Sequence, residues 1–501
     1  MYNYPEGLDF VSMGTVWKDN QMKQERFIGR SKEKEILEEY FTSQKSEFVA
    51  IYGRRRVGKT YLVKETLGER LDFEFSGMYQ VPAKIQIREF QKKLNNRRGK
   101  RTATPKDWFE AFDHLQEYLI DLGKSRVAVF LDELPWMDTA KSNFLAALSA
   151  FWNEWTGRQE ILKLYVCGSA TTWMVDKLIG DKGGLYGRLS RSIYLRPFTL
   201  HETEQYLNQV KHMKYGPKLV LDTYMILGGI PYYLDMLDSK KPLNINIDNL
   251  FFAESAPLKT EFEFLFRSLF KDSFNYRKVI EFISTKLIGQ TREEIAAGCK
   301  LEGGELSKIL KNLSLCDFIR SYTAPKKKER SRMYQLTDMF SLFYLRFVQN
   351  GEGLDEYFWS NQGQTGKKSA WSGYAFEQVC LLHINQIKNK LGISGILSNA
   401  YAWSCKSYTD SEGNSWRGGQ IDLIIDRNDG VMNLCEMKYS ADEFIISADY
   451  ARTVRNRTAM FKATERVRKD LRCTFVTPFG IKRNMNSDIV DDQIKLEDLF
   501  T

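Results

Sequence analysis

The chain has few of the residues that build metal centres and disulfide frameworks. Its 501 residues include only four histidines, which are dispersed. Its seven cysteines are scattered, odd in number and never in a CxxC pair: Cys167, Cys299, Cys316, Cys380, Cys405, Cys435 and Cys473. The sequence therefore indicates neither a zinc site nor a disulfide framework.

Long apolar runs are also absent. No stretch approaches the roughly 20 apolar residues of a membrane span. The polar N-terminal residues 1–5 lack the basic-then-apolar pattern of a secretion signal. We therefore expect a cytoplasmic protein without membrane contact. The net charge of +9 is modest for this length and permits contact with nucleic acid if basic side chains cluster on one face.

A glycine-rich run gives the strongest chemical signal. Residues 53–60 fit the phosphate-binding pattern GxxxxGK[ST], between an apolar run at 47–52 that predicts a buried strand and a helix-like segment at 61–67. In such loops backbone N–H groups surround the phosphates, the lysine reaches the β and γ phosphates, and the hydroxyl binds Mg²⁺. We expect an ATP or GTP site rather than an incidental turn. Its residues are Gly53, Arg54, Arg55, Arg56, Val57, Gly58, Lys59 and Thr60.

An acidic pair follows a second apolar run. Residues 125–134 predict a strand that ends in Asp132 and Glu133, the Walker B arrangement, downstream of the phosphate loop. In this arrangement the first carboxylate holds Mg²⁺, and the second orients or deprotonates the attacking water. We assign these roles to Asp132 and Glu133 respectively.

Two further positions are candidates for sensing or stabilising the γ phosphate. Residues 161–168 predict a third strand, and Ser169 follows it at the sheet edge where the phosphate loop opens. A helix N-cap is the alternative role for Ser169. An arginine supplied in cis or by a neighbouring subunit stabilises transition-state charge. Arg188 is the first choice and Arg191 the second, with a surface ion pair as the alternative for either.

The order of these motifs resembles that of archaeal-type ATPases of the AAA+/STAND class. The likeness also includes Phe27-Ile28-Gly29-Arg30 and the segment 228–234, which is similar to the GxP motif of that class. The resemblance implies an α/β P-loop domain with a helical lid, using ATP and Mg²⁺. It also implies that Ile28 and Arg30 line the nucleotide pocket and that Pro231 lies near the adenine.

The middle of the chain has the pattern of a winged helix-turn-helix. Helices are predicted at 276–286, from 291 and at 305–315, and strands at 318–322 and 332–336 flank the charged segment 326–331. If DNA is the ligand, the third helix would enter a major groove and the wing would touch phosphates. Winged helices also serve as packing modules in this ATPase class. Because the third helix has only Lys308 and Lys311 as cations, both roles stay open.

A second set of chemical residues lies near the C-terminus. Two apolar runs, 418–426 and 431–438, flank a turn signal at 427–430 and predict a β-hairpin. Asp422 and Glu436 can then lie close on adjacent strands. Lys438 is two residues beyond Glu436 and points to the same face. Such a group can bind Mg²⁺ and activate water against a phosphodiester.

This hairpin resembles the PD-(D/E)xK nuclease superfamily. In domain order the chain is also similar to archaeal-type ATPases fused to an uncharacterised C-terminal region. The resemblance implies that Asp422, Glu436 and Lys438 are catalytic, and that Glu377 is a supplementary metal ligand on a helix continuing through Leu382 and Ile384. The first motif lacks the superfamily's proline, because Ile421 precedes Asp422. A degenerate, purely structural version is the alternative.

The basic segment 450–468 predicts a helix that follows a phosphate backbone or is simply solvated. We expect four parts: a P-loop core at 1–200, a helical lid at 201–272, a winged helix at 273–348 and a nuclease-like α/β domain at 349–501. The leading hypothesis is an ATPase that couples nucleotide state to nucleic-acid engagement and cleavage. DNA is the expected partner, and both a monomer and a homo-oligomer stay open. The alternatives are an ATP-dependent switch and a DNA-binding regulator, both without cleavage.

Overall fold

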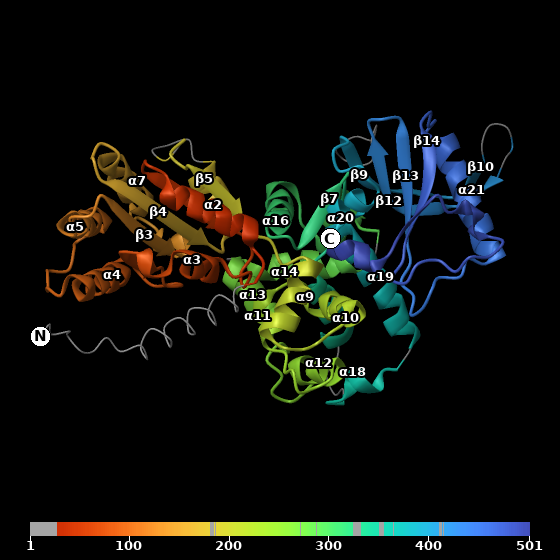
Figure 1. The fold of residues 1–501 in the computed structure, drawn as a ribbon, viewed down its shortest axis with the longest axis horizontal. Coiled ribbons are helices and arrows are strands. Elements are labelled where there is room, and N and C mark those ends of the chain that lie inside the picture. The colour runs from red at the N-terminus through yellow and green to blue at the C-terminus, as the bar shows by residue number, and fades with distance from the viewer. Residues whose placement is uncertain are drawn as a thin grey trace, which may run out of the picture.

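A computed structural model of the chain describes residues 28–180, 185, 187–270, 272–286, 288–323, 332–349, 355–363, 365–409, 413 and 415–501. Two sheets lie at opposite ends of the molecule, with helices between and below them (Figure 1). The C-terminus lies between the two ends, close to the central helices. Among the described residues, no helix is long and apolar enough to cross a membrane.

The N-terminal sheet is parallel and has the order β2-β3-β4-β1-β5. Its strands are β1 (Glu47–Tyr52), β2 (Phe73–Ser76), β3 (Arg126–Asp132), β4 (Ile161–Gly168) and β5 (Arg191–Tyr194). The nearly unbroken burial of β1, β3 and β4 is that of central strands covered on both faces. The three strands predicted from apolar runs are confirmed. The short strands β2 and β5 at the two edges were not predicted.

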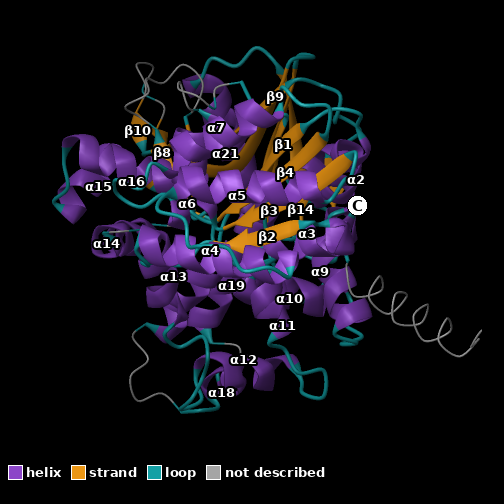
Figure 2. Cartoon of the chain, turned by 90° about the vertical axis from the view of Figure 1, so that its left-hand side faces the viewer, coloured by secondary structure: helices purple, strands orange, loops and turns teal. Residues whose placement is uncertain are grey.

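Helices cover both faces of this sheet, and Figure 2 shows its strands enclosed by them. Residues of α2 and α3 pack in the cluster on one face, and residues of α4, α5 and α7 pack in the cluster on the other. The helices of this part are α2 (Ser31–Thr42), α3 (Lys59–Leu67), η1 (Gly68–Arg70), α4 (Ala83–Arg98), α5 (Trp108–Asp121), α6 (Leu134–Met137), α7 (Phe144–Trp155), α8 (Thr171–Trp173) and η2 (Met174–Ile179).

Two helical groups follow. The first contains α9 (Leu200–Gln205), η3 (Tyr206–Val210), α10 (Pro217–Leu227), α11 (Pro231–Asp235), α12 (Leu243–Phe251) and α13 (Glu261–Leu269). The second contains α14 (Ser273–Ser284), α15 (Arg292–Cys299) and α16 (Gly303–Leu315) beside the antiparallel sheet of β6 (Gln290–Thr291), β8 (Met333–Leu336) and β7 (Ile319–Tyr322). Thr291 caps α15 with a capping box. The predicted wing, 326–331, lies outside the described residues.

The chain then passes through α17 (Met339–Phe343), η5 (Tyr344–Val348) and α18 (Phe358–Asn361) to a mixed sheet of order β15-β14-β13-β12-β9. Its strands are β9 (Ser398–Cys405), β12 (Gly419–Arg427), β13 (Val431–Met437), β14 (Asp470–Val476) and β15 (Asp492–Ile494), with a separate pair β10 (Tyr408–Thr409) and β11 (Ser415–Trp416). The helices of this part are α19 (Gly366–Leu382), α20 (Ile384–Lys390), α21 (Ala448–Thr464), η6 (Ser487–Ile489) and η7 (Leu496–Phe500).

One hydrophobic cluster joins the two ends of the molecule. It runs from Val49 and Ile51 of β1, through the central helices, to Leu423 and Val476 of the C-terminal sheet. Side chains far apart in sequence therefore share a single buried interior. This continuity places both candidate sites on one packed body.

Candidate nucleotide and metal sites

The phosphate loop connects β1 to α3 and needs glycine at both of its ends. Gly53 has φ +145°, and a Cβ atom there would lie 2.3 Å from the Leu195 carbonyl oxygen. Gly58 has φ +90° at the start of α3. Residues with a side chain rarely adopt such φ angles, so the shape of the loop depends on these two glycines.

Lys59 and Thr60 stand at the first turn of α3. The Lys59 ammonium donates to the carbonyls of Gly53 and Arg54 at 3.0 and 2.9 Å, and burial lowers its pKa. The Thr60 hydroxyl donates to Asp132 Oδ2 at 2.8 Å. The structure thus brings together a hydroxyl and a carboxylate that the sequence separates by 72 positions.

Asp132 and Glu133 differ in their surroundings. Asp132 is 7% exposed, burial raises its pKa, and Ser76 Oγ lies 3.5 Å from its Oδ2. A carboxylate beside two hydroxyls is a donor set that suits Mg²⁺, because this ion prefers oxygen ligands. Residues Thr60 and Asp132 therefore fit the metal implied by the motif.

Glu133 contacts Ser169, the residue predicted to sense the γ phosphate. The Ser169 hydroxyl donates to Glu133 Oε1 at 2.5 Å, and the Ser169 N–H donates to Oε2 at 3.1 Å. Glu133 itself has φ 46°, which directs the chain sharply away from β3. Ser169 does not cap α8, whose N-cap residue is Ala170. The structure thus places Glu133 and Ser169 at adjacent strand ends, in direct contact.

The three arginines of the loop point to protein partners. Arg54 pairs with Asp338, and Arg56 pairs with Glu261 of α13. The Arg55 guanidinium lies 5.9 Å from the centre of the Trp136 ring. Contacts with phosphate at these positions are thus left to the backbone N–H groups. Sequence reasoning missed Asp338 and Glu261, because no local pattern marks a carboxylate that meets the loop only after folding.

A cavity of about 810 Å³ lies beside the loop. Gly29 and Arg30 line one side, and Gly228 to Ile230 line another. Arg30 is 6% exposed and donates to the carbonyls of Arg196 and Val57 at 2.5 and 3.3 Å. Ile28 is half-buried just before Gly29, and Pro231 begins α11 just after Ile230. The two segments implied by the family resemblance therefore meet around one cavity.

Arg188 and Arg191 lie at the edge of the sheet. Arg188 occupies the turn before β5, and Arg191 is the first residue of that strand. Both side chains are exposed. Because β5 pairs only with β1, this edge of the sheet is open among the described residues.

The C-terminal candidate residues meet at the hairpin of β12 and β13. Leu423 pairs with Cys435 and Ile424 with Leu434 in an antiparallel register, which confirms the predicted hairpin. Lys438 Nζ lies 3.9 Å from Asp422 Oδ2 and 3.7 Å from Glu436 Oε2. The hairpin therefore gathers two carboxylates and one ammonium from three separate positions.

Glu436 is also held by α21. Arg457 forms an ion pair with its Oε1, and the Tyr450 hydroxyl donates to Oε2 at 2.8 Å. The carboxylate, 2% exposed, raises the pKa of Arg457 against the opposing effect of burial. The helix that carries these partners ends at Thr464, before the predicted 468. Arg457 of this basic helix therefore faces the candidate site rather than solvent.

Glu377 approaches the hairpin from α19. Burial raises its pKa to about 8, with a further contribution from Asp422, and burial together with Glu436 raises the pKa of Asp422 to about 6. This crowding of acidic groups suits a cation. However, the described residues contain no group of three or more His, Cys, Asp or Glu spaced to hold a metal ion. The helix of Glu377 ends at Leu382, and Ile384 begins a separate helix.

The third helix of the predicted winged helix lies against the N-terminal part. Lys311 of α16 pairs with Asp176 of η2 at 2.8 Å. A groove of about 790 Å³ is lined by residues of both α16 and α8, and Lys308 is one of them. Of the two cations of α16, Lys311 therefore already has a protein partner, while Lys308 is exposed.

Comparison with known proteins identifies the N-terminal part. Residues 27–237 match the family described as "ATPase domain predominantly from Archaea". The "Uncharacterized protein MJECL04" of Methanocaldococcus jannaschii is 25% identical over 426 residues, which are 82% of this chain and 87% of that protein. The "Uncharacterized ATP-binding protein MJ0423" of the same organism is 46% identical over 41 residues, 8% of this chain and 70% of that protein.

A solved structure also resembles the chain. "The Walker-type ATPase PABY2304 of Pyrococcus abyssi" is 19% identical, covers 64% of this chain and 96% of its own, and superposes with a TM-score of 0.47.

Proposed function

Residues 27–237 form an archaeal-type P-loop ATPase domain, and on this premise we propose that the chain binds and hydrolyses ATP with Mg²⁺. The contact that carries the proposal is the 2.8 Å hydrogen bond between Thr60 and Asp132, which gathers the oxygens that would hold Mg²⁺. Mg²⁺ supplies charge stabilisation on the transferring phosphoryl group. The cavity beside Arg30 and Ile230 is the proposed site of the base.

The remaining residues of the site have distinct proposed tasks. Lys59 would exchange its two carbonyl partners for phosphate oxygens, which attract an ammonium more strongly. Glu133 would position a water molecule and take a proton from it. Ser169, already bonded to Glu133, would fix the orientation of the Glu133 carboxylate. Arg188 is exposed at the sheet edge, so we assign it to the site of a neighbouring subunit, with Arg191 as the second choice.

Steady-state ATP hydrolysis tests this part of the proposal. The wild type should hydrolyse ATP only with Mg²⁺, and a chelator should stop the reaction. Lys59→Ala should abolish this hydrolysis. Lys64→Ala is the matched control, because Lys64 lies on the same helix and pairs with Glu74 at 3.0 Å on the surface. Hydrolysis that survives in Lys59→Ala would contradict the assignment.

We further propose that residues 273–348 are a winged helix and that residues 349–501 are a metal-dependent nuclease domain of the PD-(D/E)xK type. The observation that carries this proposal is the meeting of Lys438 with Asp422 and Glu436 within 4 Å. Two carboxylates with substrate phosphate are a common way to hold Mg²⁺. Lys438 would then neutralise charge on the phosphodiester, and Glu377 would be a supplementary ligand.

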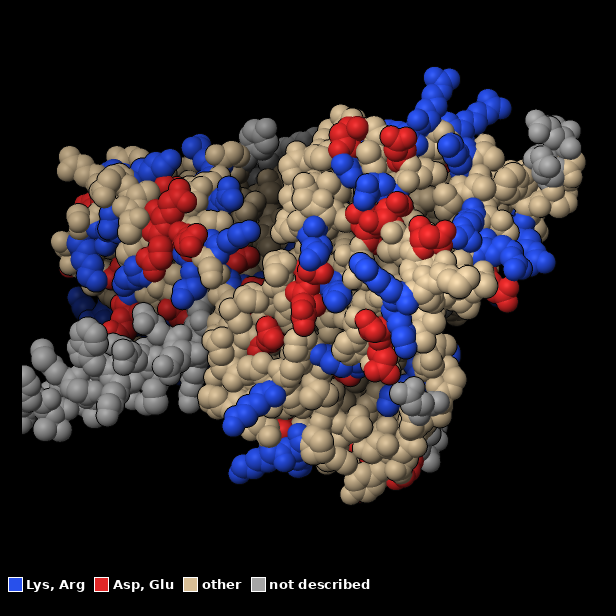
Figure 3. All heavy atoms as spheres, turned by 45° about the vertical axis from the view of Figure 1, so that its right-hand side comes forward, with Lys and Arg blue, Asp and Glu red and all other residues tan. Residues whose placement is uncertain are grey.

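Nucleic-acid binding would need a local basic surface. On the face shown in Figure 3, Lys and Arg are interspersed with Asp and Glu over most of the surface. Helix α21 exposes Arg452, Arg455 and Lys462, of which Arg452 pairs with Asp449 and Arg455 with Asp488 at the surface. We propose that a phosphate backbone, DNA in the first instance, follows this helix toward Glu436.

Cleavage of single- and double-stranded DNA and RNA with Mg²⁺ or Mn²⁺ tests the nuclease proposal. Lys438→Ala and Glu436→Ala should remove cleavage. Lys469→Ala is a matched control, because Lys469 pairs with Asp426 of the same sheet at 2.6 Å. Cleavage that persists in Lys438→Ala but is lost in Lys469→Ala would refute the site.

A specific observation favours the alternative of a nucleotide switch without cleavage. Arg457 and Tyr450 occupy both oxygens of Glu436, and the described residues offer no cluster of three metal ligands. If the wild-type protein hydrolyses ATP but cleaves no nucleic acid with either metal, the switch is the better description. ATP-modulated binding of a specific duplex without cleavage would instead indicate a regulator.

A further inference from the structure

The first arginine of the phosphate loop is buried in an ion pair with a residue far along the chain. The side chains of Arg54 and Asp338 are 2% and 4% exposed. Both guanidinium nitrogens Nη1 and Nη2 face the carboxylate, the second at 3.3 Å. Although burial favours the neutral form of Arg54, Asp338 outweighs it and raises the Arg54 pKa. The two groups are therefore fixed to each other in a bidentate geometry.

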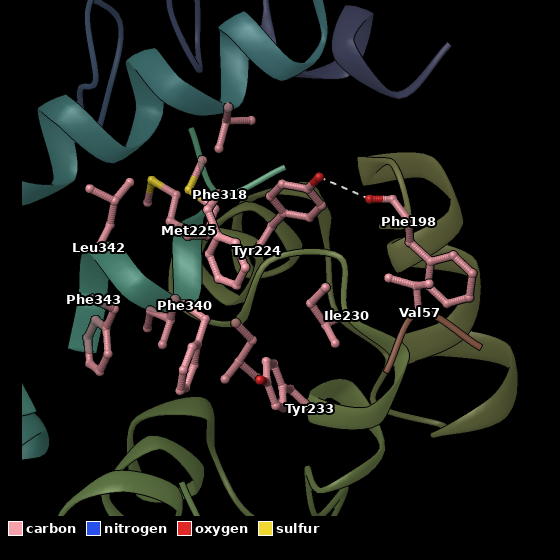
Figure 4. Close-up of a cluster of buried hydrophobic side chains, with 14 of the residues drawn as sticks. Val57, Phe198, Tyr224, Met225, Ile230, Tyr233, Phe318, Phe340, Leu342 and Phe343 are labelled. Atoms are coloured by element: carbon pink, nitrogen blue, oxygen red, sulfur yellow. Dashed lines mark hydrogen bonds between the residues drawn. The ribbon is translucent and has the colours of Figure 1, made fainter. Parts of the chain in front are cut away.

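Asp338 also fixes the start of α17. Its Oδ2 accepts the N–H and the hydroxyl of Ser341 at 2.9 and 2.5 Å, which caps the helix. Helix α17 lies deep in the molecule, where Phe340 packs 4.8 Å from the ring of Tyr233 on α11 (Figure 4). One carboxylate therefore touches both the phosphate loop and a central helix of the core.

The main chain of Arg54 is held from the opposite side by the lysine of the motif. Lys59 Nζ donates to the Arg54 carbonyl at 2.9 Å. A continuous series of contacts thus leads from Lys59 to Arg54, then to Asp338 and α17. The guanidinium also lies 4.6 Å from the centre of the Phe318 ring, so it has little room to move by itself.

We propose that Asp338 is a positioning residue of the nucleotide site. It holds the phosphate loop in shape through Arg54 and links the loop to α17. The inference rests on the proposed binding of ATP at Lys59. Because Asp338 contacts both Arg54 and α17, a change of loop shape on nucleotide binding alters the environment of α17. Loss of the Asp338 carboxylate in turn alters the affinity for nucleotide.

A double-mutant cycle with titrated MgATP, in the full chain, tests the proposal. Asp338→Asn keeps an oxygen that can cap α17 but removes the charge, and should weaken MgATP binding by about tenfold. Arg54→Met should have a similar effect. The double variant should resemble Arg54→Met alone, because Asp338 acts through Arg54. Effects that simply add, or a change below about twofold in Asp338→Asn, would overturn the proposal.

Two controls separate positioning from folding. Asp107→Asn removes the charge of another N-cap, which accepts the Glu110 N–H at 3.0 Å and has no place in this series of contacts. It should leave MgATP affinity unchanged. Ser341→Ala should lower stability while leaving affinity nearly intact, since the ion pair remains.

Amide hydrogen exchange of α17 gives a second readout. Saturating MgATP should change exchange at residues 339–343 in the wild type but not in Arg54→Met at equal saturation. An unchanged α17 in a wild type that binds MgATP would overturn the inference alone. Absence of MgATP binding by the wild type would instead refute the proposed nucleotide site, so the two failures are distinguishable.

Discussion

The two candidate sites each contain a lysine and acidic residues, yet they balance charge differently. At the phosphate loop, Lys59 rests on neutral carbonyls, and hydroxyls bond both Asp132 and Glu133. At the C-terminal hairpin, Lys438 and Arg457 stand beside the carboxylates themselves. Neutral partners can be exchanged for phosphate and metal at little electrostatic cost, whereas a metal at the second site must compete with a guanidinium.

Among the carboxylates compared above, the largest effect should come from Glu436, whose ion pair belongs to the second site. Glu436→Gln leaves the Arg457 guanidinium, 15% exposed, without its partner. An uncompensated buried charge costs about 4 kcal/mol of stability. Chemical denaturation of the wild type and the variant measures this difference. A double variant Glu436→Gln with Arg457→Met should recover most of the loss, and failure to recover would mean that the pair is not the cause.

The corresponding change at the first site, Glu133→Gln, should leave the stability of the fold unchanged. Glu133→Gln keeps a hydrogen-bond acceptor for Ser169 but cannot take a proton, so ATP hydrolysis should fall at least about 100-fold, or about 3 kcal/mol in barrier height. MgATP affinity and the unfolding midpoint should change little, since no buried charge is left unpaired. A large loss of stability in Glu133→Gln would show that the two sites do not differ in how they balance charge. Wild-type rates of hydrolysis would show that Glu133 is not the base.

The sequence predicts the local motifs of both sites but not the partners that tertiary packing brings to them. A phosphate loop is local, because its glycines, Lys59 and Thr60 act through one turn, and the buried strand 47–52 before it was predicted to the residue. The hairpin was equally readable from its turn signal. The partners Asp338 and Arg457 were not, since they reach Arg54 and Glu436 only through tertiary packing. Strands β2 and β5 escaped prediction because they are four residues long and partly exposed.

A buried histidine joins the two regions and predicts sensitivity to acid. His383, between α19 and α20, donates from Nδ1 to the Val379 carbonyl at 2.8 Å and accepts the Leu200 N–H at Nε2 at 3.0 Å. Burial lowers its pKa to about 4. The folded state therefore favours the neutral ring, and its stabilising effect is lost as pH falls from about 6.5 toward 4.

Between pH 8 and pH 5 this group alone should cost about 2 kcal/mol of stability. Denaturant midpoints at the two pH values measure the loss. His383→Gln cannot titrate and should show a smaller pH dependence, while the exposed His201→Gln should behave as the wild type. An identical pH dependence in His383→Gln would exclude the histidine as the cause.

Removing the Arg457 guanidinium should strengthen metal binding at the second site. Arg457→Met frees Glu436 for a metal, so the midpoint of a Mn²⁺ titration at pH 8 should shift to about tenfold lower concentration, or about 1.4 kcal/mol. Arg455→Met is the matched control, because Arg455 lies on the same helix and pairs with the exposed Asp488. Equal metal affinity in Arg457→Met and the wild type would show that the guanidinium does not oppose metal binding.

The smallest effect should come from an ion pair that is exposed instead of buried. Lys311 and Asp176 are 55% and 45% exposed, and water screens their attraction across the boundary between α16 and the N-terminal part. Asp176→Asn should therefore lower stability by only about 0.5 kcal/mol, as measured by denaturant midpoint. The pair of Lys286 and Glu294, 43% and 41% exposed, provides the comparison through Glu294→Gln, because it lies within the group of α14, α15 and α16. A loss above about 2 kcal/mol in Asp176→Asn alone would mean that this contact, rather than apolar packing, holds α16 against the ATPase domain.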